Sequence, residues 1–140
     1  MAAIHNEFDR LFTSWFSTLI EDDSMHAELS ASFAPLITQN GYDADVAHLS
    51  GGEKTSVALA YRLALNTVVN RLLRSLRTTD LLILDEPTDG FSTEQLDRVR
   101  IVLESLECKQ VLLVSHEQKM ESYVDHVVRI TKQHGLSTLA

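Results

Sequence analysis

Apolar residues recur at steps of three and four positions in two long parts of the chain. The first set lies between residues 4 and 20 and consists of Ile4, Phe8, Leu11, Phe12, Trp15, Phe16 and Leu19. This spacing places all of them on one helical face and predicts an amphipathic helix over 4–20. We favour docking of that face on the chain's own core. The alternative is a junction to a coiled coil or to a partner.

The second set predicts a long helix from Glu53 to Leu76. Its apolar positions are Val57, Tyr61, Leu65, Val68, Val69, Leu72, Leu73 and Leu76. Arg71, Arg74 and Arg77 share one side of this helix at three-residue steps. We interpret them as a solvated helix face, with contact to DNA or to a partner as the alternative.

Between the two helices the pattern changes to a period of two. Apolar and polar residues alternate over 25–33, which predicts a half-buried strand. Pro35 allows a sheet edge or a bend, and Asn40-Gly41 indicates a turn. Residues 42–48 are expected to form a loop.

The second half of the chain combines short apolar runs with helical patterns. Leu81–Leu84 is too short for a helix and has no polar face, so it predicts a central parallel strand. Ser92–Gln95 is a capping box that begins another helix. Gln110–Val114 predicts a second buried strand, followed by a short helix near 117–122 and a last strand over Asp125–Ile130. This alternation predicts an α/β layer with a parallel sheet.

Composition narrows the class of protein. The chain has 140 residues, 44% of them hydrophobic and 23% charged, as expected for a single globular domain. A net charge of −8 disfavours general attraction to nucleic acid, so any DNA-binding groove would be local or on another chain. Cys108 is the only cysteine, which excludes an intrachain disulfide. The sequence shows neither a membrane span nor a signal peptide, and we expect no secretion and no membrane contact.

Two adjacent acids, Asp85 and Glu86, follow the first apolar strand. Ligands of open α/β sheets bind beyond the carboxyl ends of the strands, so this pair points at a site. Because neighbouring side chains of an extended segment diverge, we assign Asp85 to magnesium and Glu86 to orienting and deprotonating a water. The alternative is a buried pair that caps the turn before Pro87, which is costly without a cation.

The stretch Ser50-Gly51-Gly52-Glu53 begins the long helix. Glycines expose backbone amides, and the positive end of the helix dipole favours an anion, so the stretch suits a terminal phosphate. A simple glycine turn with a serine or glutamate cap explains the same residues equally well. The stretch lacks the Gly-Lys-Ser/Thr step of a phosphate loop, so this sequence contains no cradle for two phosphates.

His116 follows Ser115 at the end of the second apolar strand. A lone histidine is more often structural than catalytic. Its placement parallel to Asp85 and Glu86 favours a role near the terminal phosphate or the attacking water. The other histidines show no spacing typical of metal ligands; they are His5, His26, His48, His126 and His134.

Together these stretches resemble the ABC-type ATPases, in matching order from about residue 49 to residue 130. Leu49–Glu53 is similar to their signature motif, Ile83–Pro87 to their Walker B strand with its catalytic glutamate, and Ser115-His116 to their switch histidine. Thr88–Ser92 falls at their dimer-contact loop, where the family usually has an aspartate near the position of Ser92. The resemblance implies the C-terminal lobe of a P-loop ATPase head: an α/β fold with a mostly parallel sheet flanked by helices, plus an N-terminal amphipathic helix.

Two features favour one branch of that family. The signature ends in Glu53, where transporters usually have glutamine, and the helix that follows is long. Leu49–Arg62 and Leu81–Thr88 look most like the DNA double-strand-break repair ATPase Rad50 and its SMC-like relatives. In those proteins a coiled coil separates the two ATPase halves. By this resemblance, residues 1–24 are the base of the returning coil and residues 25–140 are the lobe.

The resemblance also implies roles for individual residues. An N-terminal half would hold ATP and Mg²⁺, Asp85 would complete the metal site, Glu86 would activate water, and His116 would sense the terminal phosphate. The ATP held by a second head would contact the signature residues Leu49, Ser50, Gly51, Gly52 and Glu53. The dimer-contact loop would be Thr88, Asp89 and Gly90.

The expected consequence is an ATP hydrolase that is active only as a composite. Two heads would close as a homodimer on ATP and gate the access of DNA to a nuclease partner. The expected location is the cytoplasm, at the nucleoid, or the nucleus. The alternatives are an SMC- or RecN-like chromosome ATPase lobe and a docking lobe without catalysis. A transporter ATPase is the least favoured.

Overall fold

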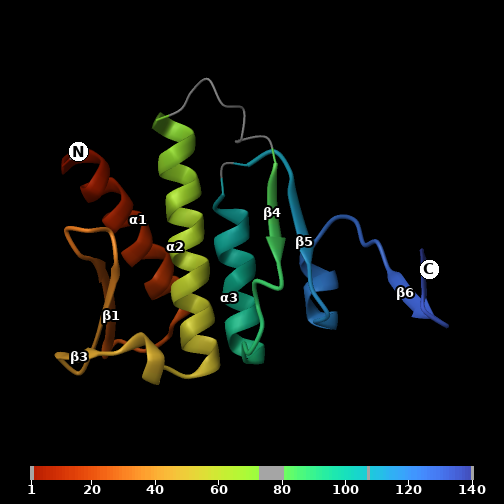
Figure 1. Cartoon of the computed structure of the whole chain (residues 1–140), viewed down its shortest axis with the longest axis horizontal. Helices are drawn as coiled ribbons and strands as arrows, with labels where there is room; N and C mark the ends of the chain where they lie inside the picture. Colours follow the sequence, from red (N-terminus) through yellow and green to blue (C-terminus); the bar gives the residue numbers. More distant parts are fainter. Residues whose placement is uncertain (1, 73–80, 107, 140) are drawn as a thin grey trace.

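The computed structural model describes residues 2–72, 81–106 and 108–139. Helices α1, α2 and α3 lie across the molecule, with the first sheet beside α1 and strands β4 and β5 beyond α3 (Figure 1). In chain order the elements are α1 (Ala2–Leu19), β1 (Met25–Leu29), β2 (Pro35–Gln39), β3 (Tyr42–Ala44), η1 (Val46–His48), α2 (Gly51–Leu72), β4 (Leu82–Asp85), α3 (Thr93–Glu104), β5 (Val111–Val114), η2 (Gln118–Tyr123), β6 (Ile130–Gln133) and β7 (Leu136–Leu139). This α/β architecture is the predicted one.

The predicted N-terminal helix is confirmed as α1, and its apolar face is docked on the chain's own core. Phe12, Phe16 and Leu19 are fully buried, and they share one apolar cluster with Leu63 of α2 and Val99 of α3. The boundary drawn between residues 24 and 25 and the coiled-coil origin of α1 stay predictions.

A row of polar side chains joins α1 to strand β1. Thr13 Oγ1 donates to the carbonyl of Ala27 at 2.8 Å, and the amide of Leu29 donates to Asp9 Oδ1 at 2.6 Å. One turn earlier, His5 Nε2 lies 2.7 Å from the carbonyl oxygen that follows the strand. Strand β2 pairs with the other edge of β1, so the Ala27 carbonyl and the Leu29 amide on the free edge find their partners on α1.

The segment after α1 differs from the prediction. The strand predicted over 25–33 ends at Leu29, and the expected bend and loop contain strands β2 and β3. The Asn40-Gly41 turn is confirmed: both residues have positive φ, 52° and 79°, as a two-residue hairpin turn requires. That turn joins β2 to β3, and β2 also pairs with β1, so the three strands form one antiparallel sheet in the order β1-β2-β3.

The long second helix is confirmed as α2. It begins at Gly51, and the predicted continuation beyond Leu72, with Arg74 and Arg77, lies outside the described residues. Arg71 is half exposed and forms an ion pair with Glu7 of α1. This arginine therefore ties two helices together at the surface.

Strands β4 and β5 pair in parallel, as predicted, with Leu82 opposite Val111 and Asp85 opposite Val114. Their complete burial was predicted wrongly. Leu82 and Leu84 are buried, whereas Ile83 is 49% exposed. The reason is that the described part of the chain covers only one face of this sheet, which is small, with two strands of four residues each.

The end of the chain also differs from the prediction. The strand expected over Asp125–Ile130 is absent, and residues 124–129 form no regular element. Instead β6 and β7 form an antiparallel hairpin around His134-Gly135, two residues with positive φ. The positive φ at the turn lets the tail fold back on β6, and every residue of both strands is exposed. The short helix near 117–122 is confirmed as η2.

No helix in the described part of the chain is both long enough and apolar enough to cross a membrane.

Candidate functional site

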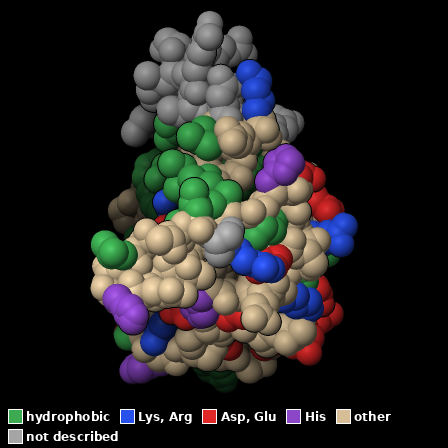
Figure 2. Space-filling model, turned by 90° about the vertical axis from the view of Figure 1, so that its right-hand side faces the viewer, with side chains coloured by type: hydrophobic (Ala, Val, Ile, Leu, Met, Phe, Trp, Pro, Cys, Tyr) green, Lys and Arg blue, Asp and Glu red, His purple; other side chains and the backbone are tan. Residues whose placement is uncertain are grey.

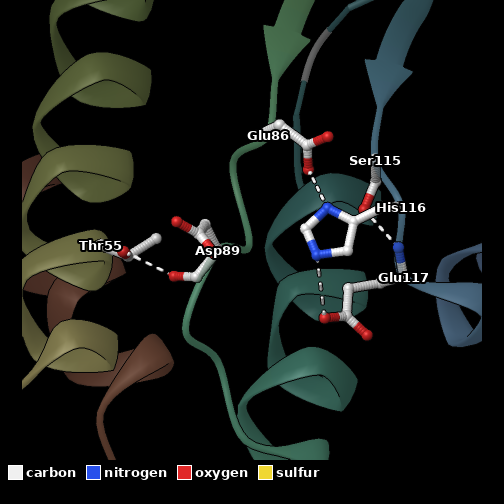
Figure 3. A network of polar contacts seen from close by, with 6 residues as sticks. All are labelled: Thr55, Glu86, Asp89, Ser115, His116 and Glu117. Atoms are coloured by element: carbon white, nitrogen blue, oxygen red, sulfur yellow. Dashed lines mark hydrogen bonds and ion pairs between the residues drawn. The ribbon is translucent and has the colours of Figure 1, made fainter.

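The turn between β4 and α3 packs against the start of α2. Thr55 Oγ1 donates to the carbonyl of Asp89 at 2.8 Å (Figure 3). Gly90 has φ of 76°, and a Cβ there would lie 3.4 Å from the carbonyl carbon of Gly51. The structure thus brings the predicted signature stretch and the predicted dimer-contact loop into direct contact.

The two glycines of the predicted signature stretch serve different purposes. A Cβ on Gly52 would lie 2.7 Å from Gln95 Oε1 and 3.0 Å from the carbonyl oxygen of Gly90, so any larger residue would clash. A Cβ on Gly51 would meet nothing within 4 Å. Gly52 therefore allows close packing on α3, and Gly51 leaves the N-terminus of α2 open to solvent.

That N-terminus carries a reciprocal cap. The amide of Ser50 donates to Glu53 Oε2 at 2.7 Å, and the amide of Glu53 lies 3.3 Å from Ser50 Oγ. The capping interpretation of this stretch therefore holds in the structure. Ser50 and Gly51 are nevertheless exposed while Leu49 is buried, so the backbone start of the helix stays accessible to an anion.

Glu86 and His116 lie together at the carboxyl edge of the parallel pair. Glu86 Oε2 is 2.9 Å from His116 Nδ1 (Figure 3), and the side chains are 42% and 66% exposed. The amide of Glu86 donates to the carbonyl of Val114 at 2.9 Å, and Glu86 has φ of 43°. Sequence reasoning placed both residues at neighbouring strand ends but did not predict this contact.

Glu117 was missed by sequence reasoning. Its Oε1 lies 3.8 Å from His116 Nε2, and its amide donates to Ser115 Oγ at 3.1 Å. The imidazole therefore stands between two carboxylates, Glu86 on one side and Glu117 on the other. The only sequence signal was that Glu117 directly follows the histidine.

Asp85 ends β4 on the exposed face of the strand. Within the described residues its carboxylate has no hydrogen-bond or ion-pair partner, and no cluster of three or more histidine, cysteine or acidic side chains has the arrangement of a metal site. A single accessible carboxylate fits Mg²⁺, which takes few protein ligands and otherwise keeps waters and phosphate oxygens. The residues present thus fit the ion that the resemblance implies.

Thr88 lies at the centre of the turn. Its side chain is fully buried, and within the described residues Oγ1 has no hydrogen-bond partner. A buried hydroxyl without a partner costs about 1–3 kcal/mol. The turn that carries Glu86 and Gly90 in left-handed conformations therefore also contains an unsatisfied polar group.

No family model matches the chain. Sequence similarity connects it to archaeal proteins named DNA double-strand break repair Rad50 ATPase. The Thermococcus kodakarensis protein is 33% identical over 105 residues, which are 74% of this chain and 11% of that protein. The Halobacterium salinarum protein is 32% identical over 136 residues, 91% of this chain and 15% of that protein. The chain thus spans only a small part of the relatives that it matches.

Solved SMC structures share the fold. A chain from a study of ATP-driven dimerization and DNA-stimulated activation of SMC ATPases has a TM-score of 0.75 and 19% identity, over 100% of this chain and 85% of that chain. The SMC head domain from Thermotoga maritima has a TM-score of 0.67 and 20% identity, over 96% of this chain and 47% of that one. At these identities the likeness concerns the fold alone.

Proposed function

Because this chain is a C-terminal ATPase lobe of the Rad50 and SMC type, we propose that it supplies one half of a composite ATP-hydrolysing site. The observation that carries the proposal is the contact between Glu86 and His116, 2.9 Å apart at the carboxyl ends of two parallel strands. The start of α2, with the signature stretch, packs on the loop that follows Glu86. Hydrolysis mainly requires such positioning of a base and of charge-stabilising groups.

In this proposal each group has one task. The Glu86 carboxylate orients a water and accepts its proton, and the His116 imidazole holds that carboxylate until a terminal phosphate arrives. Asp85 is the residue that would hold Mg²⁺. When bound, this ion would neutralise phosphate charge.

The remaining site residues face a second head. Within the stretch Leu49–Glu53, the exposed Ser50 and Gly51 contact the phosphates held by that head. In the loop Thr88–Gly90, the exposed Asp89 and Gly90 line the contact between the two heads, and the buried Thr88 supports the loop from inside. Two closed heads then act as an ATP-dependent dimer, since ATP binds the closed state better than the open one.

The N-terminal half with the phosphate loop would dock on the open face of β4 and β5. Four residues on this face are roughly half exposed although all are aliphatic: Leu81, Ile83, Leu112 and Val114. Figure 2 views the side on which β5 and the C-terminal segment lie, and it shows hydrophobic side chains gathered in one region of this side. Exposed apolar patches of this kind mark interaction sites.

A direct test is ATP hydrolysis by this chain with and without a separately expressed N-terminal half. We expect phosphate release only from the mixture, because the chain carries the general base but no phosphate cradle. A stable complex without hydrolysis would contradict the catalytic proposal and favour a docking lobe. Hydrolysis by the chain alone would contradict the composite site.

The Ser50→Arg variant should lose ATP-driven dimerisation. The larger, charged side chain would fill the accessible start of α2, where we place the phosphates of the opposite head. Nucleotide binding by the N-terminal half should be unchanged, because that half is untouched. Light scattering with and without ATP measures the dimer. The matched control is Ser14→Arg, which adds the same group to an exposed position on α1. Dimers of normal affinity in Ser50→Arg would contradict this contact.

The biological setting follows from the relatives by analogy. We propose that head closure gates the access of DNA to a nuclease partner at double-strand breaks, as part of a Rad50-type complex in the nucleoid or nucleus. An SMC-like role in chromosome organisation is the second candidate, favoured by the likeness to SMC head structures.

A further inference from the structure

The segment that follows His116 is fastened to α3 by a polar cluster. Lys119 Nζ lies 2.7 Å from Asp97 Oδ1 and donates to the carbonyl of Thr93 at 3.0 Å. The Tyr123 hydroxyl donates to the same Asp97 oxygen. Lys119 is the second residue of η2 and Tyr123 is its last. Both ends of this short helix are therefore bonded to one carboxylate on α3.

Both members of the ion pair are held in their charged forms. The hydrogen bond from Lys119, aided by that from Tyr123, lowers the pKa of Asp97, and the hydrogen bond to Asp97 raises the pKa of Lys119. The contact is therefore fully formed between the two titrations. It weakens when acid protonates Asp97 and when strong base deprotonates Lys119.

The link from Lys119 back to the histidine is short and internally bonded. The amide of Met120 donates to the carbonyl of Glu117 at 3.0 Å, and the amide of Glu117 donates to Ser115 Oγ at 3.1 Å. Because only two residues separate Lys119 from His116, a displacement of the lysine backbone must move the histidine.

Helix α3 also anchors the other member of the catalytic pair. Its N-cap is Ser92, whose Oγ accepts from the amide of Gln95, and the turn that begins with Glu86 leads directly into this cap. Glu86 is thus connected to α3 through the turn that leads into its N-cap, and His116 is connected to α3 through the ion pair of Lys119. Helix α3 therefore helps to position both side chains, Glu86 and His116.

We propose that Lys119 and Asp97 are positioning residues for the pair formed by Glu86 and His116. They hold the segment after β5 against α3 and so fix the imidazole at hydrogen-bond distance from the glutamate. The catalytic consequence rests on the proposed ATPase function, whereas the positioning itself is a property of this chain.

A purely structural role is the weaker explanation. The Asp97 side chain is 60% exposed, and exposed ion pairs contribute little to folding stability. Loss of the ion pair should therefore disturb the position of His116 more than the stability of the fold.

The test compares Lys119→Met with Arg129→Met. The control breaks a similar exposed ion pair in the same segment, Arg129 with Glu121 at 2.5 Å, which does not involve α3. The first readout is NMR of the chain alone, which reports the imidazole resonances of His116 and the shift that Glu86→Gln causes in them. Both should differ from the parent in Lys119→Met. Both should match the parent in Arg129→Met. The Asp97→Asn variant should repeat the effect of Lys119→Met.

The second readout is hydrolysis by the composite with the N-terminal half. In Lys119→Met we expect kcat to fall about ten- to a hundredfold with KM unchanged, since misplaced catalytic groups slow chemistry rather than binding. Lys119→Arg, which keeps the charge, should restore most of the rate.

The two proposals fail in different ways. Unchanged His116 resonances in both Lys119→Met and Asp97→Asn would overturn the positioning role, whatever the hydrolysis rate. Changed resonances together with no hydrolysis by the parent composite would support the positioning role and contradict the ATPase function. A parent-like kcat in Lys119→Met would also overturn the positioning role.

Discussion

The Glu86→Gln variant, mixed with the N-terminal half, should hydrolyse ATP about a hundred- to ten-thousand-fold more slowly than the parent mixture. Glutamine keeps the size of the side chain and can still hydrogen-bond to His116, but its amide cannot accept a proton from water. ATP binding and head closure should therefore persist. Steady-state phosphate release measures the rate, and light scattering with ATP measures the closed dimer, which should accumulate because it no longer turns over.

The matched control is Glu117→Gln. It makes the same chemical change on the other side of the imidazole, where the two atoms are 3.8 Å apart instead of 2.9 Å. We expect a change of less than about tenfold, because this carboxylate is not the proposed base. A parent-like rate in Glu86→Gln would show that Glu86 is not the general base. Equal losses in both variants would indicate a shared electrostatic effect on His116.

The largest effect on folding is expected for Phe12→Ala. The Phe12 side chain is fully buried, and its ring lies 5.9 Å from that of Tyr61 and 6.3 Å from that of Phe16. Removal of a buried phenyl ring loses apolar burial and leaves a cavity, so the free energy of unfolding should fall by about 3–5 kcal/mol. Urea denaturation followed by circular dichroism measures it.

Tyr42→Ala is the control for this prediction. Tyr42 is an aromatic residue that is 78% exposed, and its truncation should change the free energy of unfolding by less than about 0.5 kcal/mol. If Phe12→Ala were equally mild, α1 would not belong to the core of the lobe. Residues 1–24 would then behave as a separate unit, as expected if they form the base of a coiled coil.

The elements with a strong local signal were predicted correctly. Helices α1 and α2 each carry many apolar residues at helical spacing, which few other structures accommodate. The cap of α3 was readable because Ser92 and Gln95 have the spacing of a reciprocal hydrogen bond, and both bonds form. That serine, where the family usually has an aspartate, is thus the N-cap of α3, a position that suits either residue.

The elements that depend on distant pairing were predicted poorly. Strand β3 has three residues and begins directly after the Asn40-Gly41 turn, so its own pattern is too short to read. The exposed hairpin of β6 and β7 has no buried face that could produce an alternation. The sequence pattern also did not reveal that the described part of the chain leaves one face of β4 and β5 open, because aliphatic residues occupy both faces.

In the candidate site, too, some features could be predicted from the sequence and others could not. Chain order and parallel pairing explain why Glu86 and His116 share one edge of a sheet. Glu86 also has a left-handed backbone, which no residue preference predicts for glutamate. The ion pair of Lys119 with Asp97 joins residues 22 positions apart and depends on how η2 packs on α3. Such contacts are decided by tertiary structure.

The polar row on α1 has a mechanical consequence. His5, Asp9 and Thr13 recur every four residues and bond the free edge of β1 and the residue after it, while the adjoining apolar face of the helix is buried in the core. A helix turns by about 100° per residue, so a twist of α1 by one position would break all three contacts and expose its aromatic face. Helix α1 and the β1-β2-β3 sheet should therefore respond to an applied torque as one rigid lever, and a pull along α1 should tilt both together.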